Sequence, residues 1–212
     1  MEIQKIYLAR HGETDANKNN IYQGKSLDPS LNKTGKRQAE DLARYFGKHC
    51  RNITKIIMSP SIRAVETASA IIKELWYVNG QELPAEVQPD LHEIDHGVWE
   101  GKNILEIQRA YPDLLEQWWH GDPLTVEFPG GEKIVDAIAR TDRVFTDILA
   151  ANPKGNIAIV AHGGTNSLIL SSILKATNVR GFIQRNTALN VIERWDGKYL
   201  RLPLVGSTAH LH

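Results

Sequence analysis

The sequence predicts an α/β fold: a three-layer sandwich with a mainly parallel sheet, helices on both of its faces and an antiparallel edge strand. Two patterns in the 212 residues lead to this prediction. Short apolar runs that suit buried strands alternate with segments whose apolar residues recur at helical spacing, as in repeated βα units. Near the C-terminus, two strand-like runs flank Asp196-Gly197, a dipeptide that favours a hairpin turn.

The expected elements follow in order along one domain that spans residues 1–212. Thr34 is expected to cap the first long helix, and a helical insertion is expected at about 102–126, which includes Trp118 and Trp119. The expected strands are residues 3–8, 53–58, 157–160, 189–195 and 199–204. The expected helices carry apolar residues at helical spacing: Ala39, Leu42 and Phe46; Val65, Ala68, Ile72 and Leu75; Ile134, Ile138, Phe145 and Leu149; and Leu168, Leu170, Ile173 and Leu174.

Composition narrows the class of protein. The 25 Lys and Arg residues balance the 25 Asp and Glu residues, so no overall positive field favours a nucleic acid or an anionic membrane. No stretch approaches the ~20 apolar residues of a membrane span, and the N-terminus lacks the apolar core of a signal peptide. A single cysteine, Cys50, cannot form an internal disulfide and is interpreted as structural. We therefore expect a cytoplasmic protein that binds neither nucleic acid nor membrane.

Three of the expected strands are followed by residues that suit anion binding. Arg10 and His11 follow the first strand, Arg63 comes shortly after the second, and His162 follows the strand at 157–160. In open parallel sheets, ligands bind beyond the carboxyl ends of the strands. Two imidazoles and two guanidiniums would then converge on one crevice, and adjacent glycines would let backbone N–H groups approach it. A phosphate dianion suits such a pocket, because arginine binds its oxygens in pairs.

One segment resembles the signature of the histidine phosphatase superfamily, also called phosphoglycerate mutase-like: Leu8-Ala9-Arg10-His11-Gly12-Glu13-Thr14. The resemblance continues through motifs that occur in order over nearly the whole chain. These are Asn17, Gln23-Gly24, Leu31, Thr34-Gly35, Gln38-Ala39, Ser59-Pro60, Arg63, Thr67-Ala68, Glu93, Gly97, Trp99-Glu100-Gly101 and His162-Gly163. It implies a phosphohydrolase that uses no metal and no cofactor.

The resemblance also implies a role for each catalytic residue. His11 is the phosphohistidine nucleophile, Arg10, Arg63 and His162 hold the phosphoryl oxygens, and Glu93 is the proton donor. On physical grounds His11 must be neutral, with its second ring nitrogen donating to a backbone carbonyl or a similar group. We expect a protonated His162 and a raised pKa for the Glu93 carboxyl, which would then protonate the leaving alkoxide.

Residues 92–96 also match the H-E-x-x-H pattern of zinc proteases. That chemistry needs both histidines on one face of a helix and a third ligand elsewhere. The segment follows Pro89 and runs directly into Gly97, so we expect no zinc site there.

The substrate is expected to be a small phosphorylated metabolite. Residues 93–99, 126–132 and 209–211 resemble the metal-independent phosphoserine phosphatases, in which residues matching Gln23, His96 and His210 bind the amino-acid end of the substrate. Lys133 departs from that subgroup, which often has serine there. The predicted substrate-binding set is Asn17, Gln23, Gly24, His96, Gly163 and His210.

Several alternatives remain open from the sequence. An α-ribazole phosphatase or another small-metabolite phosphatase would share the Trp-Glu-Gly stretch. A phosphoglycerate mutase would have longer insertions, and a catalytically inactive binding module would have lost one of the five catalytic residues. The exposed edge strand near 199–204 could pair across a homodimer.

Overall fold

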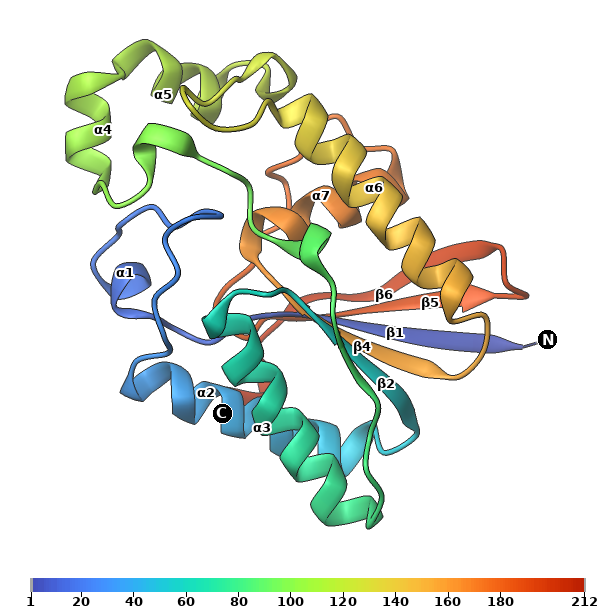
Figure 1. Cartoon of the computed structure of the whole chain (residues 1–212). Coiled ribbons are helices and arrows are strands. Elements are labelled where there is room, and N and C mark those ends of the chain that lie inside the picture. Colours follow the sequence, from blue (N-terminus) through green and yellow to red (C-terminus); the bar gives the residue numbers. More distant parts are fainter. Residues whose placement is uncertain (1, 212) are drawn as a thin grey trace.

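The computed structural model describes residues 2–211, which form a six-stranded sheet between helices (Figure 1). The strand order is β3-β2-β4-β1-β5-β6. The first four are parallel, and β5 and β6 form an antiparallel pair at one edge. The strands are β1 (Ile3–Arg10), β2 (Ile53–Met58), β3 (Ala85–Val87), β4 (Asn156–Ala161), β5 (Leu189–Trp195) and β6 (Tyr199–Ser207). The predicted fold class is confirmed.

Helices cover both faces of the sheet (Figure 1). Because side chains alternate along a strand, Tyr7 and Ala9 of β1 pack with α2 and α3, whereas Ile6 and Leu8 pack with α6 and α7. The helices are α1 (Asp15–Lys18), α2 (Lys33–His49), α3 (Ile62–Asn79), α4 (Ile104–Ala110), α5 (Pro112–His120), α6 (Ile134–Ala151) and α7 (Gly163–Leu174). Among residues 2–211, no helix combines the length and apolarity needed to cross a membrane.

A third apolar cluster lies under the segment predicted as a helical insertion. This segment forms α4 and α5, which lie beyond the carboxyl ends of the strands (Figure 1). Trp99 and Phe128 are fully buried beneath these helices, together with Ile107 and Leu115. The cluster fixes α4 and α5 above the edge of the sheet where the predicted site lies.

The structure corrects the predicted elements in two places. Asn32 caps α2 instead of Thr34, because its side chain accepts the N–H of Gly35 at 2.8 Å while its own backbone is held by the carbonyl of Glu13. Strand β3 was not predicted; it has three residues, and all of them are exposed. Such a short exposed strand has no apolar pattern to reveal it.

The edge strand β6 is where a homodimer contact was expected. Among the described residues it has a neighbouring strand on one side only, but Pro203 lacks an N–H group with which a second chain could pair. The homodimer stays a prediction.

Candidate active site

Two histidines and a serine meet where three neighbouring strands end. Strand β4 lies between β1 and β2, and the N–H of His11 donates to the carbonyl of Ala161 at 3.0 Å. The N–H of Ser59 donates to the carbonyl of Val160, also at 3.0 Å. The ring centroids of His11 and His162 are therefore only 5.2 Å apart. The two imidazoles lie side by side, as the strand pattern predicts.

The His11 imidazole is held as a neutral ring with one nitrogen facing the site. Its Nδ1 lies 2.7 Å from the carbonyl oxygen of Gly12, and Arg63 Nε donates to its Nε2 at 3.3 Å. Because Arg63 can only donate, Nε2 accepts and the ring proton lies on Nδ1. Burial lowers the pKa of His11 well below its ordinary value, and the charges of Arg10 and Arg63 lower it further. The Nε2 lone pair therefore points into a positively charged site.

His162 is buried, and its surroundings favour the neutral ring. Its Nε2 lies 2.6 Å from Ser59 Oγ, and its Nδ1 has no hydrogen-bond partner among the described residues. Burial lowers its pKa well below the ordinary value, and Arg63, His11 and Arg10 act in the same direction. The lowered pKa favours a neutral ring, mainly because the side chain is buried, and the protonated His162 expected beside the phosphoryl oxygens stays a prediction.

Arg63 is fully buried on the first turn of α3. Its Nη1 forms an ion pair with Asp28 at 3.1 Å, and its Nη2 donates to the carbonyl of Gly24 at 2.9 Å. The carbonyl of Leu27 also accepts from Nη1. These contacts fix the guanidinium so that its Nε–H faces His11, which explains why an arginine stands at the start of a helix.

Arg10 presents a free donor toward the same place. Its Nη1 donates to the carbonyl of Gln184 at 2.6 Å, whereas its Nε is buried and has no acceptor among residues 2–211. A buried N–H without an acceptor costs free energy, which an anion bound there would recover.

Glu93 lies at the N-terminus of α7. Its carboxylate accepts the N–H groups of Gly164 and Thr165, each at 3.0 Å, and that of Ile94. Burial alone would raise the pKa of the carboxyl, but the charge of His96 and these N–H groups lower it overall. The predicted raised pKa of Glu93 is therefore wrong: its surroundings lower the pKa and favour the ionised carboxylate.

Residues 92–96 do not form a zinc-binding helix. They lie between the short 3₁₀ turns Pro89–Leu91 and Gly97–Trp99, and His92 Nδ1 contacts the carbonyl of Glu93 at 2.8 Å. No group of three or more His, Cys, Asp or Glu side chains suited to a metal occurs in the described part of the chain. The H-E-x-x-H pattern therefore lacks the helical geometry that zinc proteases require.

Gln23 and His96 are close together, but they bond within the protein. His96 Nδ1 donates to the carbonyl of Gln23 at 3.0 Å, and the Gln23 side chain accepts from the Thr14 hydroxyl at 2.9 Å. The His96 ring packs against Phe128, with centroids 4.7 Å apart; burial lowers the pKa of His96, and the charge of Glu93 acts in the opposite direction. His96 therefore borders the predicted proton donor.

Of the four other predicted substrate-binding residues, two lie beside Arg10, one contacts Arg63 and one contacts Thr187. Asn17 and Gly163 lie beside Arg10: Asn17 lines the same cavity, and Gly163 packs against the guanidinium. Gly24 contributes its carbonyl to Arg63, and a Cβ there would clash with Glu100 Oε1 and lie 2.9 Å from the carbonyl oxygen of Ile94, so packing requires the glycine. The His210 Nε2 lies 3.1 Å from the Thr187 hydroxyl.

Several residues of the site had no predicted role. Ser59 follows β2 and, like Glu100, belongs to a motif of the family resemblance, but neither was assigned a function. Glu100 accepts the N–H groups of residues 25–27 and of His96, and thereby holds the loop that supports Arg63. Asp28 and Asn186 come from loops that carry no periodic signal.

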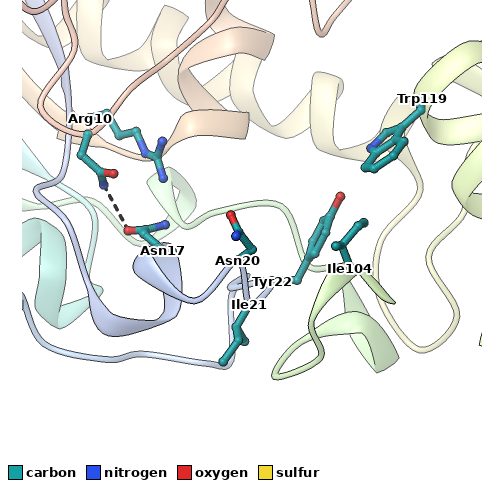
Figure 2. A pocket seen from close by; sticks show the side chains of 8 residues that line it. Arg10, Asn17, Asn20, Ile21, Tyr22, Ile104 and Trp119 are labelled. Carbon is teal, nitrogen blue, oxygen red and sulfur yellow. Dashed lines mark hydrogen bonds between the residues drawn. The ribbon is translucent and has the colours of Figure 1, made fainter. Parts of the chain in front are cut away.

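A cavity of about 530 Å³ opens beside Arg10 (Figure 2). Its polar side is formed by amides, among them Asn17 and Asn186, which bond each other at 3.1 Å. Its other side is formed by Tyr22, Trp119 and apolar side chains. A ligand could therefore place an anion at Arg10 and extend along a partly aromatic wall.

Comparison with known proteins shows the family. Residues 6–204 match the model of the histidine phosphatase superfamily, branch 1. A broad-specificity phosphatase of Saccharomyces cerevisiae is 32% identical over 99% of this chain and 88% of its own length. Phosphoserine phosphatase 1 of Hydrogenobacter thermophilus is 30% identical over 74% of this chain and 70% of its own.

Solved structures agree with the sequence relatives. YhfR of Bacillus stearothermophilus has a TM-score of 0.87 at 25% identity, over 99% of this chain and 100% of its own. A mycobacterial glucosyl-3-phosphoglycerate phosphatase has a TM-score of 0.84 at 26% identity, over 97% of this chain and 100% of its own. This chain belongs to the histidine phosphatase superfamily, branch 1, and is a phosphoric monoester hydrolase.

Proposed function

We propose that the protein hydrolyses small phosphomonoesters through a phosphohistidine formed on His11 Nε2, without a metal or another cofactor. The observation that carries this proposal is the neutral His11 ring, whose Nε2 faces the Arg63 guanidinium beside His162. Arg63, Arg10 and His162 would exchange their present contacts for the phosphoryl oxygens. These groups would stabilise the charge that a metal ion neutralises in other phosphatases.

The proposed reaction has two displacements. Glu93 takes up a proton when the phosphate dianion binds beside it. His11 Nε2 then attacks phosphorus, the bond from phosphorus to the leaving oxygen breaks, and Glu93 donates that proton to the leaving oxygen. Water then attacks the phosphohistidine and gives a proton to Glu93, so that the N–P bond breaks and inorganic phosphate leaves. A bound phosphate dianion would raise the pKa of both Glu93 and His162, because it places negative charge beside each.

For the substrate, we infer O-phosphoserine. Two relatives from Hydrogenobacter thermophilus are named phosphoserine phosphatase or putative phosphoserine phosphatase, and each matches about three quarters of this chain. The amide of Asn17 lies in the cavity next to Arg10, where it suits an ammonium or carboxylate group. The proposed substrate contacts also include Gln23, His96, Gly163 and His210, with Gly24 supporting them through Arg63.

A second candidate is a phosphatase for larger phosphomonoesters. The cavity beside Arg10 is about 530 Å³ and has Tyr22, Ile104 and Trp119 in its wall, which suits a leaving group larger than serine (Figure 2). The yeast relative named a broad-specificity phosphatase and solved structures named α-ribazole phosphatase are consistent with this alternative.

A phosphate-release panel run with and without EDTA tests the proposal. It should include O-phosphoserine, 3-phosphoglycerate, α-ribazole phosphate and p-nitrophenyl phosphate. We expect phosphoserine to be cleaved much faster than 3-phosphoglycerate and α-ribazole phosphate. EDTA should leave the rate of phosphoserine cleavage unchanged. Loss of activity in EDTA that added Zn²⁺ restores would contradict the metal-free mechanism, and equal rates on all substrates would favour the second candidate.

A further inference from the structure

Arg180 is a cation without a counter-charge near the active site. It lies in the loop between α7 and β5, with its guanidinium carbon 5.2 Å from the centroid of the Trp118 ring. Within residues 2–211 no carboxylate forms an ion pair with it, and its Nε is buried without an acceptor. Removing part of a guanidinium from water costs free energy unless an anion or another hydrogen-bond acceptor binds it.

The surroundings of Arg180 offer no strong compensation inside the protein. Burial lowers the pKa of Arg180, and among the described residues only the phenol of Tyr22, which is neutral at pH 7, acts in the opposite direction. The aromatic ring of Trp118 attracts the cation weakly but cannot accept the buried N–H in the way an oxygen does. A ligand is therefore the best candidate for the group that accepts the buried Nε–H of Arg180.

A cavity of about 210 Å³ connects Arg180 to the phosphate end of the site. Its wall includes Arg180, Gly163 and Gln184. Both of the latter touch Arg10: the Gln184 carbonyl accepts from Arg10 Nη1 at 2.6 Å, and a Cβ on Gly163 would lie 3.5 Å from Arg10 Nε. One small cavity thus has Arg180 on one side and neighbours of Arg10 on the other.

We propose that Arg180 binds a carboxylate on the leaving group, so that the preferred substrates are phosphomonoesters with this second negative charge. The inference rests on the proposed function for the position of the phosphoryl group at His11. It adds a cation to the proposed contacts of Gln23 and His96, in which His96 Nδ1 and the Gln23 side-chain oxygen already bond within the protein. Arginine suits the task, since its planar N–H groups match a carboxylate.

The test compares two substrates that differ only in the carboxylate: O-phosphoserine and O-phosphoethanolamine. We expect Arg180→Gln to lower kcat/KM for phosphoserine about 10- to 100-fold, mainly through KM, as is typical for loss of a hydrogen bond to a charged group. The value for phosphoethanolamine should stay within about twofold. Arg109→Gln, which removes the same charge from an exposed position on α4, is the matched control and should change neither value.

The outcomes separate this inference from the proposed function. An equal loss on both substrates would assign Arg180 a structural role, and unchanged values on both would exclude it from carboxylate binding; either result overturns the inference. If phosphoserine is not turned over, the two compounds can instead be compared as inhibitors of p-nitrophenyl phosphate hydrolysis. Arg180→Gln should then weaken inhibition by phosphoserine about 10- to 100-fold and change inhibition by phosphoethanolamine by no more than about twofold. Acid-labile labelling of His11 by p-nitrophenyl phosphate tests the proposed function alone, and Arg180→Gln should leave it intact.

Discussion

Replacing Gly164 by alanine should damage proton donation while leaving the nucleophile in place. A Cβ at this position would lie 2.6 Å from Glu93 Oε1 and 2.7 Å from Ile94 Cδ1. Restoring an ordinary contact of 3.4 Å requires the Glu93 carboxylate to move by about 0.8 Å. Because misplacing a catalytic group by ~1 Å can cost ~100-fold in rate, we expect kcat for phosphoserine to fall by about 10- to 100-fold.

The assay compares leaving groups and uses a neighbouring glycine as its control. p-Nitrophenolate leaves without a proton, so Gly164→Ala should slow p-nitrophenyl phosphate much less than phosphoserine. In Gly163→Ala the new Cβ would lie 3.5 Å from Arg10 Nε, where it acts on the phosphoryl group that both substrates share, so any loss should be equal on both and their rate ratio should stay as in the wild type. Full activity of Gly164→Ala on phosphoserine would refute the reasoning, as would an equal loss on both substrates.

Two further predictions concern stability. The pKa values of His11 and His162 lie well below the ordinary value of about 6.5, so below that pH the unfolded chain binds more protons than the folded chain. The free energy of unfolding should therefore decrease as the pH falls from 6.5 to 5.5, by up to about 1.4 kcal/mol per pH unit for each histidine. Urea titrations at pH 6.5 and 5.5 should show this change in the free energy of unfolding, and a smaller change in His162→Gln. An equal free energy of unfolding at both pH values would exclude neutral buried histidines. Glu100→Ala should lower stability by about 1–3 kcal/mol and raise KM, because it leaves the N–H groups of residues 25–27 and of His96 without their acceptor. An unchanged urea midpoint and KM would show that the loop is held by other contacts.

The parts of the site that the sequence could predict are those that follow from strand order. Strands end in polar residues at one edge of a parallel sheet, so His11, His162 and Arg63 could be placed together before any coordinates. The position of Asp28 beside Arg63 could not, because a loop without periodicity carries it. The lowered pKa of Glu93 depends on the N–H groups at the start of α7, and sequence alone does not show that the two segments meet.

The elements of the fold also divide into those that the sequence predicts and those that it does not. Long apolar patterns identified β1, β2, β4 and the four long helices, because burial on the sheet determines those positions. The cap of α2 was misplaced because Asn32 and Thr34 are both good capping residues, and the choice between them depends on the contact of Asn32 with Glu13. Strand β3 has no buried residue and is defined only by its hydrogen bonds to β2.

The central claim is that His11 carries the phosphoryl group during turnover, and a rapid-quench experiment tests it most directly. Protein mixed with radiolabelled substrate is denatured in base within milliseconds, and the labelled peptide is mapped by mass spectrometry. We predict up to one acid-labile, base-stable phosphate per chain on His11, and none in His11→Ala, which should fold and be inactive. Full turnover by His11→Ala, or label on another residue, would contradict the claim.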